Sequence, residues 1–352
     1  MATDQMSHGL PWLGTRGSQV VRAEDRAAVF LRGINRSGLE YSSSEAGFLQ
    51  AAGITELQIT EIVAGWGARI VRLPFNQDWA LHGRNGATAE SYLGALDQVV
   101  AWAAAAGAYT LLDLQWLDAD HFHGHLPGGD PNFVAPLPNR ATVDLWAMLA
   151  RRYRDEPAVL FDLFNEPHER LSDDEHPLCV IDANGNFADS DSYKVTSQQW
   201  LPWAAKLVAT IRAEHPQSLI WVGGTDWAFD LRGIDIAAPN IVYSTHVYPN
   251  RLKMTWSSRF GFVGENRPLF IGEFGGSDEH FEWGARLLQY MEERACGWTA
   301  WSWSDHPRLV KNAQSGDHSP TQFGGLVRGA LRPEGQGQAF LNRRGGVFGQ
   351  WS

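Results

Sequence analysis

Two short segments decide how this chain folds: Leu163–Pro167 reads Leu-Phe-Asn-Glu-Pro, and Leu269–Gly275 reads Leu-Phe-Ile-Gly-Glu-Phe-Gly. Each begins with apolar residues that are typical of a buried parallel strand, and each reaches a glutamate, Glu166 in the first and Glu273 in the second. An apolar strand has no reason of its own to finish in a carboxylate. The two segments therefore predict two carboxylates that meet at one end of a sheet.

A pair of carboxylates at one site is what cleavage of a glycosidic bond requires. One carboxylic acid protonates the leaving oxygen, and the other carboxylate attacks the sugar or activates water. A single glutamate after a strand has a simpler interpretation, because it often supplies charge to a helix N-terminus or forms a salt bridge. Two of them, one preceded by Asn165 and followed by Pro167, favour the catalytic interpretation.

The composition limits the partners that the chain can have. Its 352 residues suffice for one large domain or two, and 44% of them are hydrophobic, which is enough for a sizeable core. The formal net charge of −11 argues against nucleic acid, since no basic stripe is available to neutralise phosphates. No apolar run approaches the length of a membrane span. The 16 tryptophans suit stacking on sugars, although we expect at least half of them in the core.

The N-terminus and the cysteines give further expectations. Met1–Met6 lacks the basic and apolar regions of a secretory signal, so we expect a cytoplasmic protein, or a secreted one if a leader has been removed. Two cysteines, Cys179 and Cys296, do not make a disulfide framework. We expect no bond between them, because the fold predicted below places them near opposite ends of the strands, beyond the roughly 7 Å that a disulfide allows.

Apolar strands alternate with amphipathic helices along the chain, without a linker, a low-complexity stretch or a repeat. The predicted strands are Val29–Asn35, Ala68–Phe75, Tyr109–Gln115, Val159–Phe164, Ser218–Val222, Ile241–His246, Pro268–Glu273 and Gly297–Trp303. The clearest predicted helices are Glu90–Ala106, Arg140–Tyr153, Ser197–Glu214 and Phe281–Ala295.

Such an alternation is compatible with a closed (β/α)8 barrel or with an open doubly wound sheet. No Gly-x-Gly-x-x-Gly follows the first strand, so nothing supports a dinucleotide-binding fold. Residues with functional potential end nearly every strand: Asn35, Arg72, Gln115, Glu166, His246, Glu273 and Trp301. In a barrel these ends share one rim, where active sites lie. We therefore predict an α/β fold, a single (β/α)8 TIM barrel over residues 1–352, with an N-terminal extension and long rim loops at Gln115–Asn139 and Pro167–Val195.

Arg72 interrupts the apolar second strand, and a buried arginine is rarely tolerated unless it is paired. Its natural partner is the carboxylate of Glu273. A purely structural ion pair within the barrel is the alternative.

Two pairs of residues have the spacing of two that places side chains on one face of a strand. His246 and Tyr248 follow this pattern at the sixth strand, and both can hydrogen-bond a carboxylate or a sugar hydroxyl. Trp301 and Trp303 follow it at the last strand, where one of them could form the floor of a sugar-binding subsite.

In their order along the chain, these residues resemble the pattern of glycoside hydrolase family 5, the cellulase family of retaining barrel glycosidases. The resemblance extends from about Leu31 to Asp305. That family carries Asn-Glu-Pro after the fourth strand, a glutamate in a Gly-Glu-Phe-Gly-like setting after the seventh, an arginine after the second, His-x-Tyr after the sixth and a tryptophan after the eighth. The matching residues here are Asn165, Glu166, Glu273, Arg72, His246, Tyr248 and Trp301.

The resemblance implies a retaining hydrolase of β-linked glycans, with β-1,4-glucan as the first expectation and mannan, xyloglucan or short β-glucosides as alternatives. Glu166 would be the acid/base and Glu273 the nucleophile. The implied partner is an oligo- or polysaccharide, hydrolysis needs no cofactor, and we expect a monomer. The third strand departs from the family's Asp-x-His, since it ends Asp113-Leu114-Gln115. The predicted substrate-binding residues are Arg72, Gln115, Asn165, His246, Tyr248, Trp301 and Trp303.

Two other interpretations remain open at this point. One is a carbohydrate-binding barrel without activity, although binding alone does not need an acid beside a nucleophile. The other is a metal-dependent hydrolase that uses the loop after Gln115, which contains Asp118, Asp120, His121, His123 and His125. The segment Asp182–Asn186 begins like a calcium-binding loop, but Phe187 and Tyr193 replace the glycine and glutamate that such a loop needs, and we interpret it as a turn.

Chelation separates the metal-dependent interpretation from the glycosidase. We expect activity on a β-glycan to survive dialysis against a strong chelator, because the two glutamates act without a metal. A loss of turnover that zinc or another divalent ion restores would instead assign the chemistry to the histidine-containing loop.

Overall fold

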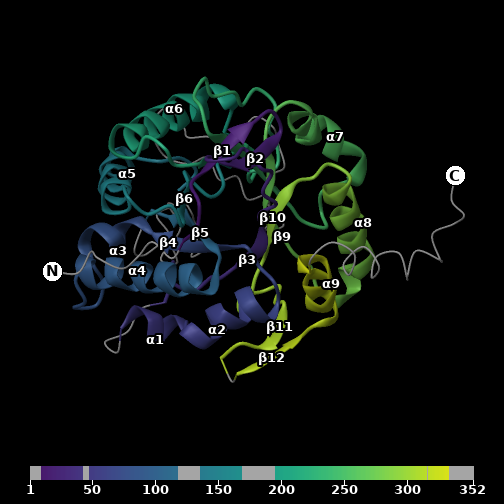
Figure 1. The fold of residues 1–352 in the computed structure, drawn as a ribbon, viewed down its shortest axis with the longest axis horizontal. Coiled ribbons are helices and arrows are strands. Elements are labelled where there is room, and N and C mark those ends of the chain that lie inside the picture. Colours follow the sequence, from purple (N-terminus) through teal and green to yellow (C-terminus); the bar gives the residue numbers. More distant parts are fainter. Residues whose placement is uncertain (1–8, 43–46, 118–134, 169–194, 315, 333–352) are drawn as a thin grey trace, which may run out of the picture.

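The computed structural model describes residues 9–42, 47–117, 135–168, 195–314 and 316–332. Eight parallel strands close a barrel in which every strand pairs with two neighbours, and the predicted (β/α)8 barrel is confirmed (Figure 1). In barrel order the strands are β3 (Arg32–Asn35), β4 (Ile70–Asn76), β5 (Tyr109–Trp116), β6 (Val159–Asp162), β7 (Ile220–Gly223), β8 (Ile241–Val247), β9 (Leu269–Phe274) and β10 (Gly297–Ala300).

The strands are apolar because they are covered on both faces. All seven residues of β4 and all seven of β8 are buried, as expected for strands with the barrel interior on one side and helices on the other. Since all eight strands run parallel, their C-terminal ends share one rim. The predicted strands all exist, with ends that differ from the prediction by a few residues.

The N-terminal extension forms a hairpin of β1 (Leu13–Arg16) and β2 (Gln19–Arg22), which sequence analysis missed. Leu13 belongs to a separate apolar cluster with Leu31, Ile70 and Tyr109, which stand at or next to the beginnings of the first three barrel strands. The Tyr109 hydroxyl donates to the carbonyl of Pro11 at 2.8 Å. The hairpin therefore closes the N-terminal end of the barrel with apolar residues.

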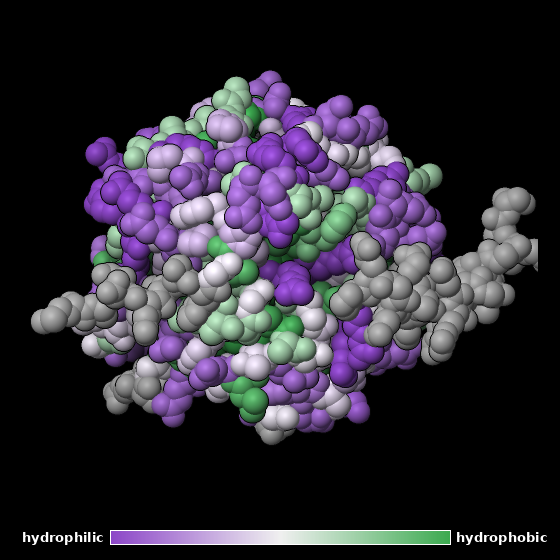
Figure 2. All heavy atoms as spheres, in the orientation of Figure 1, coloured by the Kyte–Doolittle hydropathy of each residue, from purple (hydrophilic) through white to green (hydrophobic). Residues whose placement is uncertain are grey.

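Four long helices surround the barrel: α4 (Ala89–Ala106), α5 (Arg140–Arg152), α6 (Ser197–Glu214) and α8 (Phe281–Glu292). All four were predicted. Their ends follow local chemistry, since the Thr88 side chain caps α4, Asn139 and Thr196 make capping boxes at α5 and α6, and Gly107 ends α4 with φ of 95°. Hydrophilic residues cover most of the periphery of the face shown in Figure 2.

Shorter elements complete the outer layer. They are α1 (Phe48–Ala52), α2 (Glu56–Thr60), a π-helical turn (Glu61–Gly65), α3 (Gln77–His82), three 3₁₀ turns (Lys253–Thr255, Gly261–Glu265 and Asp278–His280), α7 (Trp256–Arg259), the hairpin of β11 (Val310–Asn312) with β12 (Asp317–Pro320), and α9 (Gln322–Leu331). The connection from β7 to β8 is a compact loop without an α-helix.

Two smaller expectations have partial outcomes. Cys296 is buried with a free thiol, but Cys179 lies outside the described residues, so the absence of a bond between them stays a prediction. Over the described part of the chain, no helix combines the length and apolar character needed to cross a bilayer.

Substitution of Gly33 tests how closely the first two barrel strands approach each other. A Cβ at Gly33 would lie 1.7 Å from the backbone oxygen of Ile70, so Gly33→Ala must displace backbone. We expect it to lower the free energy of unfolding by roughly 1–3 kcal/mol. The control is Gly94→Ala on the exposed face of α4, where nothing lies within 4 Å. This control should stabilise by roughly 0.5–1 kcal/mol. Urea denaturation measures both, and equal effects would contradict the packing argument.

Candidate active site

The C-terminal rim is organised around Arg72, which extends from β4 and is fully buried. Five side chains from four strands or strand ends surround its guanidinium: Asn35 of β3, Asp113 of β5, Asp162 and Asn165 at the end of β6, and Glu273 of β9. Nε lies 2.9 Å from Asp162 Oδ2, Nη1 lies 3.0 Å from Asn35 Oδ1 and 2.7 Å from Glu273 Oε1, and Nη2 lies 2.9 Å from Asn165 Oδ1 and 2.9 Å from Asp113 Oδ1. Four of these contacts are hydrogen bonds, and the fifth, with Asp113, is an ion pair.

The charges in this shell are unequal, because three carboxylates face one guanidinium. Burial raises the pKa of Asp113 well above its ordinary value, and it raises that of Asp162 to about 6 against the opposing effect of Arg72. Burial alone would lower the pKa of Arg72, but Asp113 and Asp162 outweigh it and the net shift is upward. The arginine therefore stays charged, whereas burial favours the protonated form of Asp113 against the opposing effect of Arg72.

Glu273 is held at both carboxylate oxygens. Its Oε1 accepts from Arg72, as sequence analysis predicted, and its Oε2 accepts from the Tyr248 hydroxyl at 2.7 Å. The side chain is 5% exposed. Two donors, one of them a full positive charge, hold this side chain at both oxygens and fix its orientation.

Glu166 has a different environment. It follows β6, its side chain is 17% exposed, and its Oε1 lies 2.7 Å from His246 Nδ1. Burial raises the pKa of Glu166 to about 7, although the charges of Arg72 and Arg251 oppose the shift. The two carboxyl groups therefore have different surroundings, since Glu273 accepts from a guanidinium and a hydroxyl while Glu166 keeps its proton to a higher pH than an exposed glutamate does.

The two carboxylates are close together, since a ligand oxygen of Glu166 lies within 4.8 Å of one of Glu273. Retaining glycosidases hold their carboxyl groups about 5–5.5 Å apart, whereas inverting enzymes leave about 6.5–9.5 Å for a water molecule. The spacing here fits direct attack by a carboxylate.

His246 acts as a neutral hydrogen-bonding group, because burial lowers its pKa to about 3. Its contact with Glu166 is therefore a hydrogen bond and not an ion pair at neutral pH. Gly272 makes room for the imidazole, since a Cβ at that position would lie 2.8 Å from His246 Nε2. The glycine next to Glu273 thus positions the partner of Glu166.

Gln115 and Asn165 border a small cavity of about 60 Å³ that Glu166, His168 and Trp227 also line. Gln115 is 9% exposed, and its Oε1 has no hydrogen-bond partner among the described residues. The Oδ1 of Asn165 accepts from Arg72, so the donor of that side chain is its amide nitrogen.

The two tryptophans after the last strand differ in position. Trp301 is 8% exposed at the rim, and its Nε1 donates to the carbonyl of His306 at 3.2 Å. Trp303 has no exposed surface and packs edge-on against Trp66 with ring centroids 5.0 Å apart. The prediction of Trp303 as a substrate-binding residue is therefore wrong, because β10 ends at Ala300 and the alternation on which it rested does not continue.

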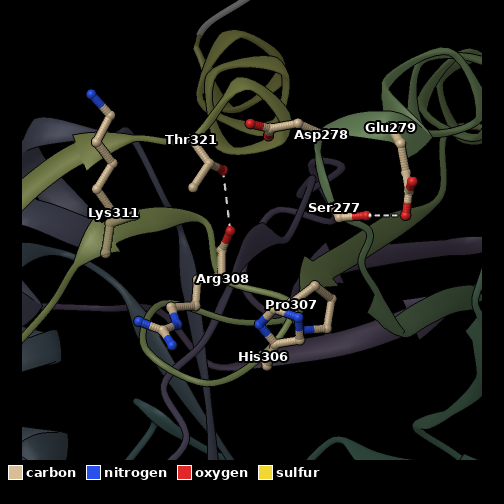
Figure 3. Close-up of a pocket in the computed structure, with 9 residues that line it drawn as sticks. Ser277, Asp278, Glu279, His306, Pro307, Arg308, Lys311 and Thr321 are labelled. Carbon is tan, nitrogen blue, oxygen red and sulfur yellow. Dashed lines mark hydrogen bonds between the residues drawn. The ribbon is translucent and has the colours of Figure 1, made fainter.

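A larger hollow of about 490 Å³ lies between the loops that follow β9 and β10. It adjoins Trp301, whose indole donates to His306 in its wall. Figure 3 shows side chains of both charges around it, together with the hydrogen bonds from Thr321 to the Arg308 carbonyl and from Ser277 to Glu279. Sequence analysis did not identify these residues.

The histidine-containing loop with Asp118, Asp120, His121, His123 and His125 lies outside the described residues, as does the segment Asp182–Tyr193. Within the described part of the chain, Glu166, His246 and Glu273 have the spacing of a metal site. The donor set argues against this use, because Arg72 lies 2.7 Å from Glu273 and its positive charge opposes a second cation there.

Comparison with known proteins agrees with this geometry. The family model "Cellulase (glycosyl hydrolase family 5)" matches residues 29–307. The chain belongs to this family. It is 24% identical over 295 residues to an endoglucanase of Thermobifida fusca, covering 79% of this chain and 52% of the relative, so it spans about half of that protein's length. An endoglucanase of Paenibacillus polymyxa is 23% identical over 342 residues, covering 82% of this chain and 78% of the relative.

Solved structures share the fold. A β-glucanase from Saccharophagus degradans, solved in complex with cellotetraose, has a TM-score of 0.70 at 20% identity and covers 94% of this chain and 96% of its own. The catalytic domain of a Thermobifida fusca endoglucanase has a TM-score of 0.65 at 20% identity, with coverage of 91% and 97%.

Several residues of the site were not predicted from sequence. Asp162 ends the apolar run of β6, so the signal that identified Glu166 and Glu273 was present there as well. His168 and Trp227 stack with ring centroids 4.1 Å apart beside Glu166, and Arg251 contributes charge to that carboxyl. No local pattern in the sequence indicated these three.

The protonation of Glu166 predicts the pH dependence of activity. If Glu166 must carry a proton, kcat/KM should fall as the pH rises through about 7, because the raised pKa loses its proton there. Glu166→Gln should abolish this alkaline limb and should slow substrates with poor leaving groups most. The loss in kcat/KM is compared between a glycan and an activated aryl glycoside. Equal losses for both substrates would show that Glu166 is not the acid.

Proposed function

We propose that this chain is a retaining hydrolase of β-1,4-glucan that acts through Glu166 and Glu273. One observation carries the proposal: Glu273 accepts hydrogen bonds at both carboxylate oxygens from Arg72 and Tyr248, while Glu166 beside it has a pKa raised to about 7. A site that only binds sugar has no use for this difference in environment between adjacent carboxyl groups.

In the first step, a Glu273 oxygen attacks the anomeric carbon and Glu166 transfers its proton to the glycosidic oxygen, which leaves with the other sugar. Glu166 is then a carboxylate and takes a proton from water, whose oxygen attacks the anomeric carbon and releases Glu273. The Asn165 amide, oriented by Arg72, would donate to the sugar 2-hydroxyl as positive charge develops at the anomeric carbon. His246 holds Glu166 in place during both steps.

The substrate class rests on the family and on the shape of the rim. Both relatives described above are named as endoglucanases, and a structural neighbour was solved with cellotetraose bound. The hollow beside Trp301 offers hydroxyl, carboxylate and cationic groups that suit sugar hydroxyls. Mannan, xyloglucan and short β-glucosides would use the same catalytic pair and remain alternatives. No step requires a second subunit, and we propose that the enzyme acts as a monomer.

Product stereochemistry and a substrate panel test this function together. Proton NMR of the first product from cellotetraose should show the β anomer, and β-glucan should be cleaved faster than mannan, xyloglucan or aryl β-glucosides. Glu273→Gln should remove turnover and leave substrate binding. An α anomer released first would overturn the nucleophile assignment. Binding without turnover on every substrate would instead identify a carbohydrate-binding barrel.

A further inference from the structure

Two buried aspartates beside Arg72 have no role in the two reaction steps. Asp113 of β5 and Asp162 of β6 are partners in the register of these neighbouring strands, so their side chains point to the same face of the sheet. That face is the barrel interior, because each side chain lies 2.9 Å from the Arg72 guanidinium. The two side chains are 0% and 1% exposed. The pair is therefore out of reach of the substrate.

The carboxyl oxygens of this pair have few hydrogen-bond donors. Asp162 Oδ2 accepts from Arg72 Nε, whereas Asp162 Oδ1 and both oxygens of Asp113 have no hydrogen-bond partner among the described residues. Two ionised carboxylates side by side in the interior repel each other, and a buried charged oxygen without a donor is costly. A proton on the pair removes one of the two charges and supplies a donor that is missing.

The charges around the pair also favour a proton on it. Arg72 of β4 is the cation in contact with the pair, and it is shared with Glu273 of β9, whose Oε1 lies 2.7 Å away. Glu40, after β3, opposes ionisation of the pair, and the β7 residue in register with it, Trp221, is uncharged. Burial raises the pKa of both aspartates against the opposing effect of Arg72. One guanidinium faces up to three carboxylates, and a proton on the pair reduces that number to two.

We propose that Asp113 and Asp162 hold one proton and one negative charge between them, and that this charge is the counter-ion of Arg72 while Glu273 is bonded to the sugar. The proton belongs to the pair and not to one residue, as is usual when two close carboxyl groups titrate together. The inference rests on the proposed function and adds two positioning residues, which act through Arg72 and do not touch the substrate.

The need for this second anion arises in the first reaction step. As a Glu273 oxygen bonds to the anomeric carbon, Glu166 gives its proton to the leaving oxygen, so the negative charge passes from Glu273 to Glu166. Within the described part of the chain, Glu166 forms no ion pair with Arg72. Without the pair, the buried guanidinium would lose its contacting anion in the glycosyl-enzyme, which is costly. With the pair it keeps one, and it continues to hold the Asn165 amide.

Isotope-edited infrared spectroscopy counts the protons on the pair. With isotope-labelled aspartate at neutral pH, the unaltered enzyme should show the carbonyl stretch of one un-ionised carboxylic acid, displaced by the label. Asp113→Asn and Asp162→Asn should each abolish this band. The reason is that the remaining aspartate, alone beside Arg72, gives up the proton and keeps the charge.

The matched control for the infrared measurement is Asp230→Asn. Burial would raise the pKa of Asp230, but hydrogen bonds from Arg232 and Arg259 outweigh it and the net shift is downward. Its replacement should leave the band unchanged. A spectrum of the unaltered enzyme without the band would show that both members of the pair are ionised. A band that survives either single substitution in the pair would assign the proton to one residue alone. Each of these two results would overturn the proposal.

The counter-ion role is tested by the double variant Asp113→Asn/Asp162→Asn, which removes the last charge of the pair. With an activated aryl β-cellobioside, release of the aryl group measures formation of the glycosyl-enzyme, and the mass of acid-quenched enzyme measures how much of it carries sugar. Formation should be about tenfold slower than the product of the two single-variant effects, which corresponds to about 1.4 kcal/mol of coupling. Breakdown of the intermediate should not slow in proportion. Single-variant effects that simply multiply would overturn the counter-ion role.

Circular dichroism and the melting temperature show which variants fold. If the double variant does not fold, the unaltered enzyme trapped with a 2-fluoro-cellobiosyl group on Glu273 replaces it. Its aspartate band should not exceed that of the free enzyme, and a second proton on the pair would overturn the counter-ion role. If the unaltered enzyme cleaves no β-glycoside, the proposed function fails, whereas the infrared count still decides whether the pair holds one proton.

Discussion

The site depends on the single buried guanidinium of Arg72. Four hydrogen bonds and an ion pair connect it to side chains from around the barrel, and this one ion joins the strands that carry the reacting groups. A buried charge is tolerable only with such compensation. Because the acceptors include Asn165 and Glu273, a change in the orientation of the guanidinium would move the nucleophile and its neighbouring amide together. The contacts that compensate the buried charge of Arg72 are therefore the same contacts that fix the catalytic geometry.

The difference between the two glutamates follows from what faces them. Glu273 receives the arginine and a tyrosine hydroxyl, both donors, whereas Glu166 receives a neutral imidazole and is partly removed from water. His246 cannot supply a compensating positive charge, because burial lowers its pKa to about 3. If that imidazole were charged, it would stabilise ionised Glu166 and lower the pKa of the acid. Burial of the histidine thus helps to keep the proton on Glu166.

Sequence analysis predicted the barrel and most of the rim because each successful residue contrasts with an apolar strand, as Arg72 does within β4. It missed the residues whose contacts leave no local pattern in the sequence. The left-handed residues Asp226–Ala228 include no glycine, so nothing in the sequence marks the turn that positions Trp227. The helix α9 contains adjacent glycines, which lower helix propensity, and Gly324 is needed because a Cβ there would lie 1.8 Å from the Leu309 oxygen. Such requirements arise from tertiary packing and are visible only in the folded chain.

The two ends of the barrel have different roles, since one end stabilises the fold and the other carries the reacting groups. At the N-terminal end, the hairpin of β1 and β2 covers an apolar cluster that includes Ile70 and Tyr109. At the other end lie buried carboxyl groups and a run of left-handed residues, both of which lower stability. Such features persist only where the surrounding structure over-determines them, and the closed ring of parallel strands connects the two ends. The apolar closure of one end is therefore a physical condition for the charged and strained arrangement at the other.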